Sequence, residues 1–337
     1  MKLVTYMTEE LEERLGIWIN GKVADVENEG KRFNLELPND ILELLESENA
    51  LMKKAQELNT KLHENDFTAV KYDVILPPVP YPVSCRDAYA FREHVAAARK
   101  NRGVDMIPEF DQFPIFYFTN HNAIFGEGIV PVEKDHLQKL DFELEIAIVI
   151  GKYGKNIAAQ DADDYIAGFT IMNDLSARQL QMEEMKLNLG PAKGKDFATV
   201  IGPWLVTPDE FADKISKTTT GNKYDLKMTA RHNGITISEG NAKDMTFTFA
   251  EIIERVSYGV EIFPGEVIGS GTVGTGCYLE LNGTRKRLAE EKGESYEPVW
   301  LQNGDDIELS IEGMGTLKNT ILWNESEYSI FDKKKKV

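Results

Sequence analysis

Two glutamates, Glu143 and Glu145, enter an apolar run. Their alternation with apolar residues predicts a strand over residues 141–150, with both glutamates on one face. Ala147 and Val149 continue that face, so the strand is expected to be buried on both sides. Two like charges in a buried strand repel each other and are costly to desolvate, and a bound cation would relieve both costs. The alternative is an edge strand whose glutamates lie in water.

A third acidic residue, Asp174, stands between a strand-like segment and a helical pattern over residues 175–185. Aspartate at such a junction is a good helix N-cap, which would be a purely structural role. Arg178 and Gln181 follow Asp174 by four and seven residues and would share one face of that helix. A carboxylate, a guanidinium and an amide that project together from the end of a strand would also form a polar pocket.

The segment around Asp87 repeats this arrangement. Asp87 precedes a helical pattern over residues 88–100 and is expected to cap it, and His94 follows at nearly the same angle around the helix. A lone histidine is more often structural than catalytic, but a carboxylate two turns away favours a functional role. The four acidic side chains offer only oxygen ligands, which suit Mg²⁺, Ca²⁺ or Mn²⁺; they are Asp87, Glu143, Glu145 and Asp174.

A glycine-rich segment over residues 269–274 matches the G-x-G-x-x-G pattern of dinucleotide-binding loops. Such a loop needs a helix after it, whereas the pattern over residues 277–283 predicts a strand, so we reject a dinucleotide site. The glycines would instead let the backbone approach a ligand, with the Thr272 hydroxyl presented to it. Glu280 lies between two leucines of that strand and is expected to face a pocket, or else to be exposed or salt-bridged.

The length of the chain predicts about two domains. Residues 1–75 are expected to form a small N-terminal α/β domain, with a hairpin over residues 15–26 and a helix over residues 42–62. A proline-rich connector then opens the main domain, residues 76–330, in which short apolar strands outnumber helices. Residues 331–337 are expected to form a basic, solvated tail. The fold class is therefore α+β and mostly β.

Composition disfavours several classes of partner. The 337 residues carry 56 acidic against 38 basic side chains, a net charge of −18, so nucleic acids and anionic membranes would be repelled. Two cysteines cannot form a disulfide framework, and the N-terminus lacks the apolar region of a secretion signal. We therefore expect a cytoplasmic protein, and the charge does not exclude a small-molecule substrate. An anionic substrate would need a locally positive pocket.

Five segments, taken together and in this order, resemble the fumarylacetoacetate hydrolase family. The most specific part is a D-x-E-x-E strand combined with N-D-x-S-A-R, and the resemblance covers most of residues 80–325. It implies a catalytic domain built as a mixed β-roll or β-sandwich around a Mg²⁺ or Ca²⁺ ion, and we also expect a homodimer. The segments are Asp87-Ala88-Tyr89 with His94, residues 140–145, residues 172–178, residues 194–197, and Gly271-Thr272 with Glu280.

The resemblance also implies roles for individual residues. The four carboxylates named above correspond to the family's metal ligands, and His94 with Glu280 to the pair that activates water in its carbon–carbon hydrolases. Lys195 is implied as a further catalytic residue. The positions implied to lie near the substrate are Tyr89, Tyr117, Arg178, Gln181 and Thr272.

These residue types suit one reaction in particular. Cleaving a C–C bond in a 1,3-diketo acid requires water to attack one carbonyl while an enolate leaves. A divalent metal would stabilise the enolate, and His94, oriented by Glu280, would take the proton from water. Lys195, Arg178 and Gln181 would donate to oxyanions. We expect metal-dependent hydrolysis of fumarylacetoacetate or a related acylpyruvate. The alternatives are a 2-oxo acid decarboxylase or hydratase of the same family, and a non-catalytic binding protein.

Overall fold

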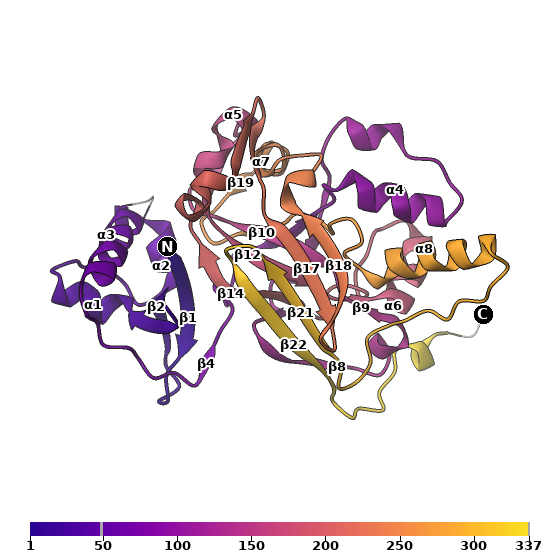
Figure 1. The fold of residues 1–337 in the computed structure, drawn as a ribbon, viewed down its shortest axis with the longest axis horizontal. Helices are drawn as coiled ribbons and strands as arrows, with labels where there is room; N and C mark the ends of the chain where they lie inside the picture. Colours follow the sequence, from indigo (N-terminus) through magenta and orange to yellow (C-terminus); the bar gives the residue numbers. More distant parts are fainter. Residues whose placement is uncertain (48–49, 336–337) are drawn as a thin grey trace.

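The computed structural model describes residues 1–47 and 50–335, and two β-sheets in contact form its centre (Figure 1). The larger sheet has eleven strands, with the main path β3-β2-β1-β14-β12-β10-β20-β5-β6, and the smaller has five, in the order β18-β17-β21-β22-β8. Strands β10, β12 and β14 of the larger sheet contact β17, β21 and β22 of the smaller one. The predicted strand-rich mixed fold is therefore confirmed.

The strands belong to these two sheets and to short two-stranded pairs. The larger sheet contains β1 (Lys2–Met7), β2 (Glu13–Ile19), β3 (Lys22–Asp25), β4 (Val74–Ile75), β5 (Cys85–Ala88), β6 (Phe116–Thr119), β7 (Ile124–Phe125), β10 (Leu144–Ile150), β12 (Ile166–Asp174), β14 (Thr199–Val206) and β20 (Val267–Gly269). The smaller contains β8 (Gly128–Val132), β17 (Lys227–His232), β18 (Ile235–Asn241), β21 (Asp306–Ile311) and β22 (Gly315–Trp323). The short pairs are β9 (Leu140–Asp141) with β13 (Ser176–Ala177), β11 (Gly154–Lys155) with β19 (Glu261–Ile262), and β15 (Ile215–Thr218) with β16 (Gly221–Tyr224).

The helices lie around these sheets. The α-helices are α1 (Val26–Arg32), α2 (Ile41–Glu46), α3 (Ala50–Glu64), α4 (Arg92–Asn101), α5 (Ala159–Ala162), α6 (Arg178–Glu184), α7 (Phe249–Ser257) and α8 (Tyr278–Glu291). The 3-10 helices are η1 (Pro108–Asp111), η2 (His136–Lys139), η3 (Asp163–Tyr165), η4 (Met185–Leu187), η5 (Pro208–Lys214), η6 (Ala242–Asp244) and η7 (Phe331–Lys333). Among the described residues no helix is long and apolar enough to cross a membrane. The cytoplasmic location stays a prediction.

Strand β10 is buried on both faces, as its sequence predicted. Ile146 and Ile148 join a hydrophobic cluster that includes residues of the smaller sheet. Ala147 and Val149 point the other way, into a cluster shared with the N-terminal segment. Only the period-two alternation of a strand sorts neighbouring residues in this way. Glu145 lies on the second face and is completely buried, so the edge-strand alternative is wrong for it.

The N-terminal segment extends the larger sheet. Its predicted hairpin is present as β2 and β3, with Asn20 and Gly21 at positive φ in the turn. Strand β1 pairs with β14, so hydrogen bonds run from this segment into the rest of the sheet. Figure 1 shows the helices α1 to α3 on the far side of β1 and β2 from the smaller sheet. The domain boundary at residue 75 stays a prediction.

Four expectations about local structure differ from what is observed. The helix expected over residues 42–62 is two helices, α2 and α3, and residues 48 and 49 of it lie outside the described part. Residues 85–88 form a strand paired with β6, so the next helix begins only at Arg92. The helix after Asp174 begins at Arg178, because β13 intervenes. The strand expected over residues 277–283 is the first turn and a half of α8.

Residues 332–335 of the C-terminal tail are exposed, and one of them also makes an ion pair. Lys334 lies 2.5 Å from a carboxylate oxygen of Glu183 on α6. Ser329 and Ile330, which precede the tail, are also held: the Ser329 hydroxyl and the Ile330 N–H donate to the buried carboxylate of Asp135. The last two residues of the expected basic tail, 336 and 337, lie outside the described part.

Candidate active site

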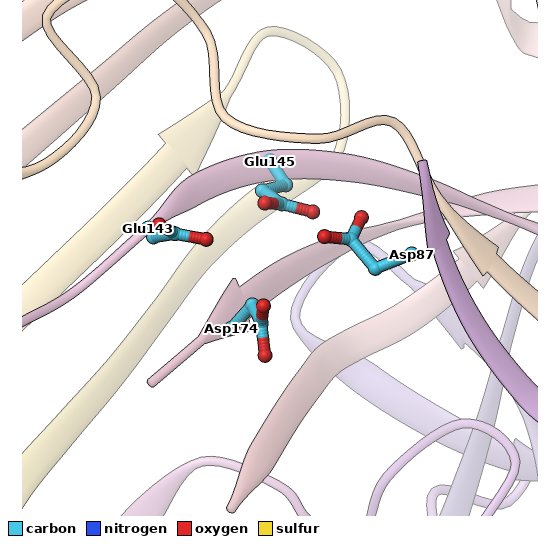
Figure 2. Close-up of side chains that lie close together, drawn as sticks. All are labelled: Asp87, Glu143, Glu145 and Asp174. Carbon is cyan, nitrogen blue, oxygen red and sulfur yellow. The ribbon is translucent and has the colours of Figure 1, made fainter. Parts of the chain in front are cut away.

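Four buried carboxylates converge where strands of the larger sheet end (Figure 2). Asp87 lies on β5, Glu145 on β10 and Asp174 at the end of β12, while Glu143 precedes β10 by one residue. One oxygen from each lies within 4.8 Å of the others. Figure 2 shows the four side chains around a shared space. The sequence prediction that these residues form one group is therefore met by their positions.

The arrangement fits a divalent cation. Glu145 Oε2 and Asp174 Oδ1 are buried and have no hydrogen-bond partner within the described residues. Orphaned carboxylate oxygens are costly, and a hard cation would satisfy them. Gly269 of β20 leaves the necessary room, because a Cβ there would lie 2.5 Å from Asp87 Oδ1 and 2.9 Å from Glu145 Oε2. The donor set is all oxygen, which suits Mg²⁺, Ca²⁺ or Mn²⁺.

Two positively charged side chains, those of Lys195 and Arg178, contact the carboxylate group. Lys195 Nζ lies 2.6 Å from Glu143 Oε2 and also donates to Asp174. Arg178 Nη2 lies 2.6 Å from the other oxygen of Glu143. Burial opposes ionisation of Glu143, but the charges of Lys195, Arg178 and then His94 hold the pKa of that carboxyl below its usual range. Glu143 is therefore a carboxylate whose charge is already compensated.

The pKa values of Asp87 and Glu145 are shifted in the opposite direction, upward. Burial and the nearby charge of Asp174 raise the pKa of Asp87 to about 8. Burial, followed by the charges of Asp87 and Glu143, raises the pKa of Glu145 well above its usual range. Both groups favour the protonated form until a positive charge replaces the proton. A divalent cation would supply that charge and release the protons on binding.

His94 and Glu280 form a buried pair beside these carboxylates. Nδ1 of His94, on α4, lies 2.6 Å from Glu280 Oε2 on α8. The second oxygen of Glu280 accepts from the Thr275 N–H at 3.0 Å. With Nδ1 engaged, Nε2 is the ring nitrogen that remains to exchange a proton. The Tyr89 ring packs edge-on against His94, with 6.0 Å between ring centres.

The glycine-rich loop between β20 and α8 joins the two groups. Gly271 N–H donates to Asp87 Oδ1 at 3.0 Å, and Thr272 Oγ1 lies 3.4 Å from Glu145 Oε1. Thr275, further along the loop, holds Glu280. A helix does follow this loop, so the expected strand is not a valid reason for rejecting a dinucleotide site. The glycines nevertheless pack against protein: a Cβ on Gly271 would lie 2.6 Å from the Ala88 carbonyl oxygen.

Asp141 is a site residue whose role the sequence did not predict. It is completely buried. Its carboxylate accepts from the N–H groups of Tyr278 and Leu279, at 2.7 and 2.9 Å, and from Arg178 Nε at 2.8 Å. Asp141 therefore stabilises the N-terminus of α8, which carries Glu280, and also orients the guanidinium that contacts Glu143. A cap 137 residues away along the chain leaves no local signal, and this explains the missed helix.

The residues expected near the substrate lie around the same carboxylates. Tyr117 donates to Asp174, and Arg178 Nη1 donates to Gln181 Oε1 at 2.9 Å. Together with Tyr89, Thr272 and Lys195, they are within the predicted site, but each is already in contact with a protein group there. Their contact with a substrate stays a prediction.

The helix-capping roles expected for two aspartates are wrong. Asp87 lies within β5, and the residue that caps α4 is Phe91. Asp174 ends β12, and Ala177 precedes α6. The two aspartates therefore do not share a helical face with the residues that follow them, although Arg178 and Gln181 do lie together on α6 and His94 and Arg178 reach the site. Glu280 likewise lies on a helix instead of a strand. In each case the type of side chain predicted the position near the site, whereas the spacing of apolar residues predicted the wrong secondary structure.

Comparison with known proteins identifies the same family that the sequence motifs resemble. The family profile described as "Fumarylacetoacetate (FAA) hydrolase C-terminal" matches residues 84–322. Oxaloacetate tautomerase YisK of Bacillus subtilis is 28% identical over 94% of this chain and 99% of its own. The mitochondrial oxaloacetate tautomerase Fahd2a of Rattus norvegicus is 30% identical over 96% of this chain and 92% of its own.

Solved structures agree on the fold. A fumarylacetoacetate hydrolase from Exiguobacterium antarcticum superposes with a TM-score of 0.67 and 24% identity, over 96% of this chain and 100% of that one. A maleylpyruvate hydrolase from Sphingobium superposes with a TM-score of 0.65 and 19% identity, over 96% of this chain and 100% of that one. At this identity the likeness concerns the fold alone.

Proposed function

This chain belongs to the fumarylacetoacetate hydrolase family, and we propose that it is a metal-dependent tautomerase that interconverts the keto and enol forms of oxaloacetate. The observation that carries the proposal is the His94–Glu280 pair beside four buried carboxylates. Tautomerisation needs a proton to leave one atom and arrive at another while an enolate is stabilised. Relatives named oxaloacetate tautomerase match over nearly the whole chain, which supports this substrate.

The metal ligands in this proposal are Asp87, Glu143, Glu145 and Asp174. A divalent ion held there, Mg²⁺, Ca²⁺ or Mn²⁺, would supply the positive charge that stabilises enolate oxygens. Glu280 holds Nδ1 of His94, so Nε2 moves the proton to or from the carbon beside the carbonyl. Tyr89 limits the space around that ring.

We infer that Lys195 and Arg178, together with a bound divalent ion, offset the charge of the buried carboxylates so that an anionic substrate can approach. The chain as a whole has a net charge of −18, which would repel a dicarboxylate. Tyr117 donates to Asp174 and the Thr272 hydroxyl lies by Glu145, whereas the two cations and Gln181 lie on the Glu143 side of the site. We propose that a substrate carboxylate is held on this side.

Tautomerase activity is tested by following the decay of enol oxaloacetate in ultraviolet absorbance. The purified protein is compared with buffer in Mg²⁺, in Mn²⁺ and in a chelator. We expect acceleration that requires the metal and releases no CO₂. Release of CO₂ in step with the decay would instead identify the decarboxylase alternative. An unchanged rate in every metal would reject the tautomerase.

Carbon–carbon hydrolysis is the second candidate, because a buried His–Glu pair is also suited to activating water. The hydroxide would attack the carbonyl while the enolate of the other fragment leaves. Acylpyruvates and fumarylacetoacetate are the substrates to assay, with cleavage products separated by chromatography. Cleavage that needs both the metal and His94 would make this chain a hydrolase. The homodimer, the cytoplasmic location and the absence of nucleic-acid and membrane partners stay predictions.

A further inference from the structure

Glu184, the last residue of α6, binds a turn that lies eight to ten residues further along the chain. One carboxylate oxygen accepts from the Lys193 N–H at 2.8 Å, and the other accepts from the N–H groups of Ala192 and Gly194, at 2.9 and 3.1 Å. A single side chain thus satisfies three successive backbone donors. Such an arrangement fixes the path of the backbone, because each donor would otherwise need its own partner.

The same turn is held at one further point on α6 and at one just before it. Gly194 lies so close to the helix that a Cβ there would be 2.6 Å from Gln181 Cβ, and its carbonyl accepts from the Ala177 N–H at 2.8 Å. The next residue is Lys195, whose ammonium contacts Glu143 and Asp174. The start of α6 carries Arg178, whose guanidinium contacts the other oxygen of Glu143. Glu184 therefore joins the two segments that bring positive charge to Glu143.

We propose that Glu184 is a positioning residue, which holds the turn at residues 192–194 against α6 so that Lys195 reaches Glu143 and Asp174. Within the described part of the chain, the hydrogen bonds of Glu184 go to this turn, and none goes to Glu143 or Asp174. Its effect on the reaction passes through Lys195, and in this respect the inference rests on the proposed function. Without the Glu184 carboxylate the turn loses three hydrogen bonds, and Lys195 becomes free to leave the site.

The test measures how accessible the Lys195 amine is, by labelling the folded, full-length protein in Mg²⁺ with an amine-reactive reagent and locating the label by mass spectrometry. In the wild type, the Lys195 side chain is 5% exposed and is expected to react far more slowly than Lys227, which is 57% exposed. Glu184→Ala raises the labelling rate of Lys195 about tenfold or more, as expected for the loss of three hydrogen bonds. Glu184→Gln raises it less, since the amide keeps one acceptor oxygen.

Glu183 provides the matched control. Its carboxylate pairs with Lys334 of the tail, so Glu183→Ala leaves the labelling of Lys195 unchanged. An unchanged Lys195 rate in a folded Glu184→Ala protein would overturn the inference. Should that protein not fold, the Glu184→Gln variant decides in the same way. These results do not depend on turnover, so they stand even if the proposed function fails.

Kinetics separate positioning from a general structural role. If Glu184 acts through Lys195, Glu184→Ala lowers the same parameter, kcat or kcat/KM, that Lys195→Met lowers. Added to Lys195→Met, it costs at most about twofold more, because residues that act as one unit are not additive. Effects that multiply in the double variant would show that Glu184 acts by another route and would overturn the inference.

Discussion

The carboxylate group and the His94–Glu280 pair lie side by side but are positioned by different means. The carboxylates sit on, or next to, neighbouring strands of one sheet. Register pairs Asp87 with Gly269, and Gly269 with Ala147 on β10, two residues from Glu145. Hydrogen bonds between strands therefore fix the spacing of the metal ligands directly.

The pair comes from two helices outside the sheet. His94 is on α4 and Glu280 on α8, and these helices pack against each other. Their position relative to the carboxylates depends on the glycine-rich loop and on Asp141. We infer that the sheet positions the metal ligands and the helices position the His94–Glu280 pair. A change in the helices should then leave metal binding intact, and this is the division between sheet and helices. The following predictions test that division, from the largest expected effect to the smallest.

Removal of the base should have the largest effect. His94→Ala is expected to lower kcat by about 10²–10⁴, the usual contribution of a general base. Mg²⁺ affinity, measured by calorimetry, should stay near the wild-type value, because His94 is not among the proposed ligands. His121→Ala, at an exposed position, is the control and should change neither. Loss of Mg²⁺ binding in the His94 variant would mean that the pair and the metal site are not separable.

Replacement of a metal ligand should instead reduce the affinity for Mg²⁺. Glu145→Gln is expected to weaken Mg²⁺ binding by about 100-fold or more, since even residues that support a ligand cost about 10–100-fold. Without metal the variant should be at least as stable as the wild type, because a neutral amide removes the repulsion between the Glu145 carboxylate and the charges of Asp87 and Glu143. Thermal melts with and without Mg²⁺ check both effects. Glu29→Gln, also buried but in the N-terminal segment on α1, is the control.

Asp141 should have an intermediate effect on catalysis. Asp141→Asn keeps one acceptor oxygen but loses the charge that attracts Arg178 and the N-terminus of α8. We expect kcat to fall about tenfold while Mg²⁺ affinity changes less than about threefold, because the helix that carries Glu280 shifts more than the sheet does. Asp135→Asn changes a buried carboxylate that likewise accepts a backbone N–H but lies away from the site, at Ser329 and Ile330. It should leave kcat unaltered. A greater loss of metal affinity than of kcat in Asp141→Asn would contradict the division between sheet and helices.

The smallest effect concerns pH. The pKa of Asp87 is raised to about 8 in the folded protein, from an ordinary value near 3.8. The folded state therefore binds this proton more tightly than the unfolded state does, and the stabilisation is lost as pH rises toward 8. In a chelator, Tm should fall between about pH 5 and pH 8, whereas the Tm increase on adding Mg²⁺ should grow over the same range. A chelated protein whose Tm rises across this range would contradict the raised pKa.

Much of the site could be predicted from the sequence, but little of its local geometry. Glu143 and Glu145 were found because a glutamate inside an apolar strand is conspicuous. Asp174 and Asp87 lie together with the two glutamates, whereas the backbone conformation expected for them was wrong, since capping is the commoner role of such aspartates. The pairing of residues 85–88 with β6 is a long-range contact that propensity does not report.

Other features depended entirely on tertiary contacts. The helix α8 follows a loop of glycines and is capped by a carboxylate from another part of the chain, so its sequence resembled a strand. Glu184 sits on an ordinary helix surface, and only the folded path of residues 192–194 reveals its three donors. Such residues support the site without having any chemistry of their own to mark them.

A crystal structure with Mg²⁺ and oxalate, a stable mimic of a 2-oxo acid enolate, tests the central claim most directly. We predict one ion bound by oxygens of Asp87, Glu143, Glu145 and Asp174, at about 2.0–2.1 Å for Mg²⁺. Oxalate should complete the coordination, and Nε2 of His94 should face oxalate or a water molecule next to it while Nδ1 stays on Glu280. An ion bound elsewhere, or a His94 ring turned away from the ligand with its Glu280 contact broken, would contradict the account.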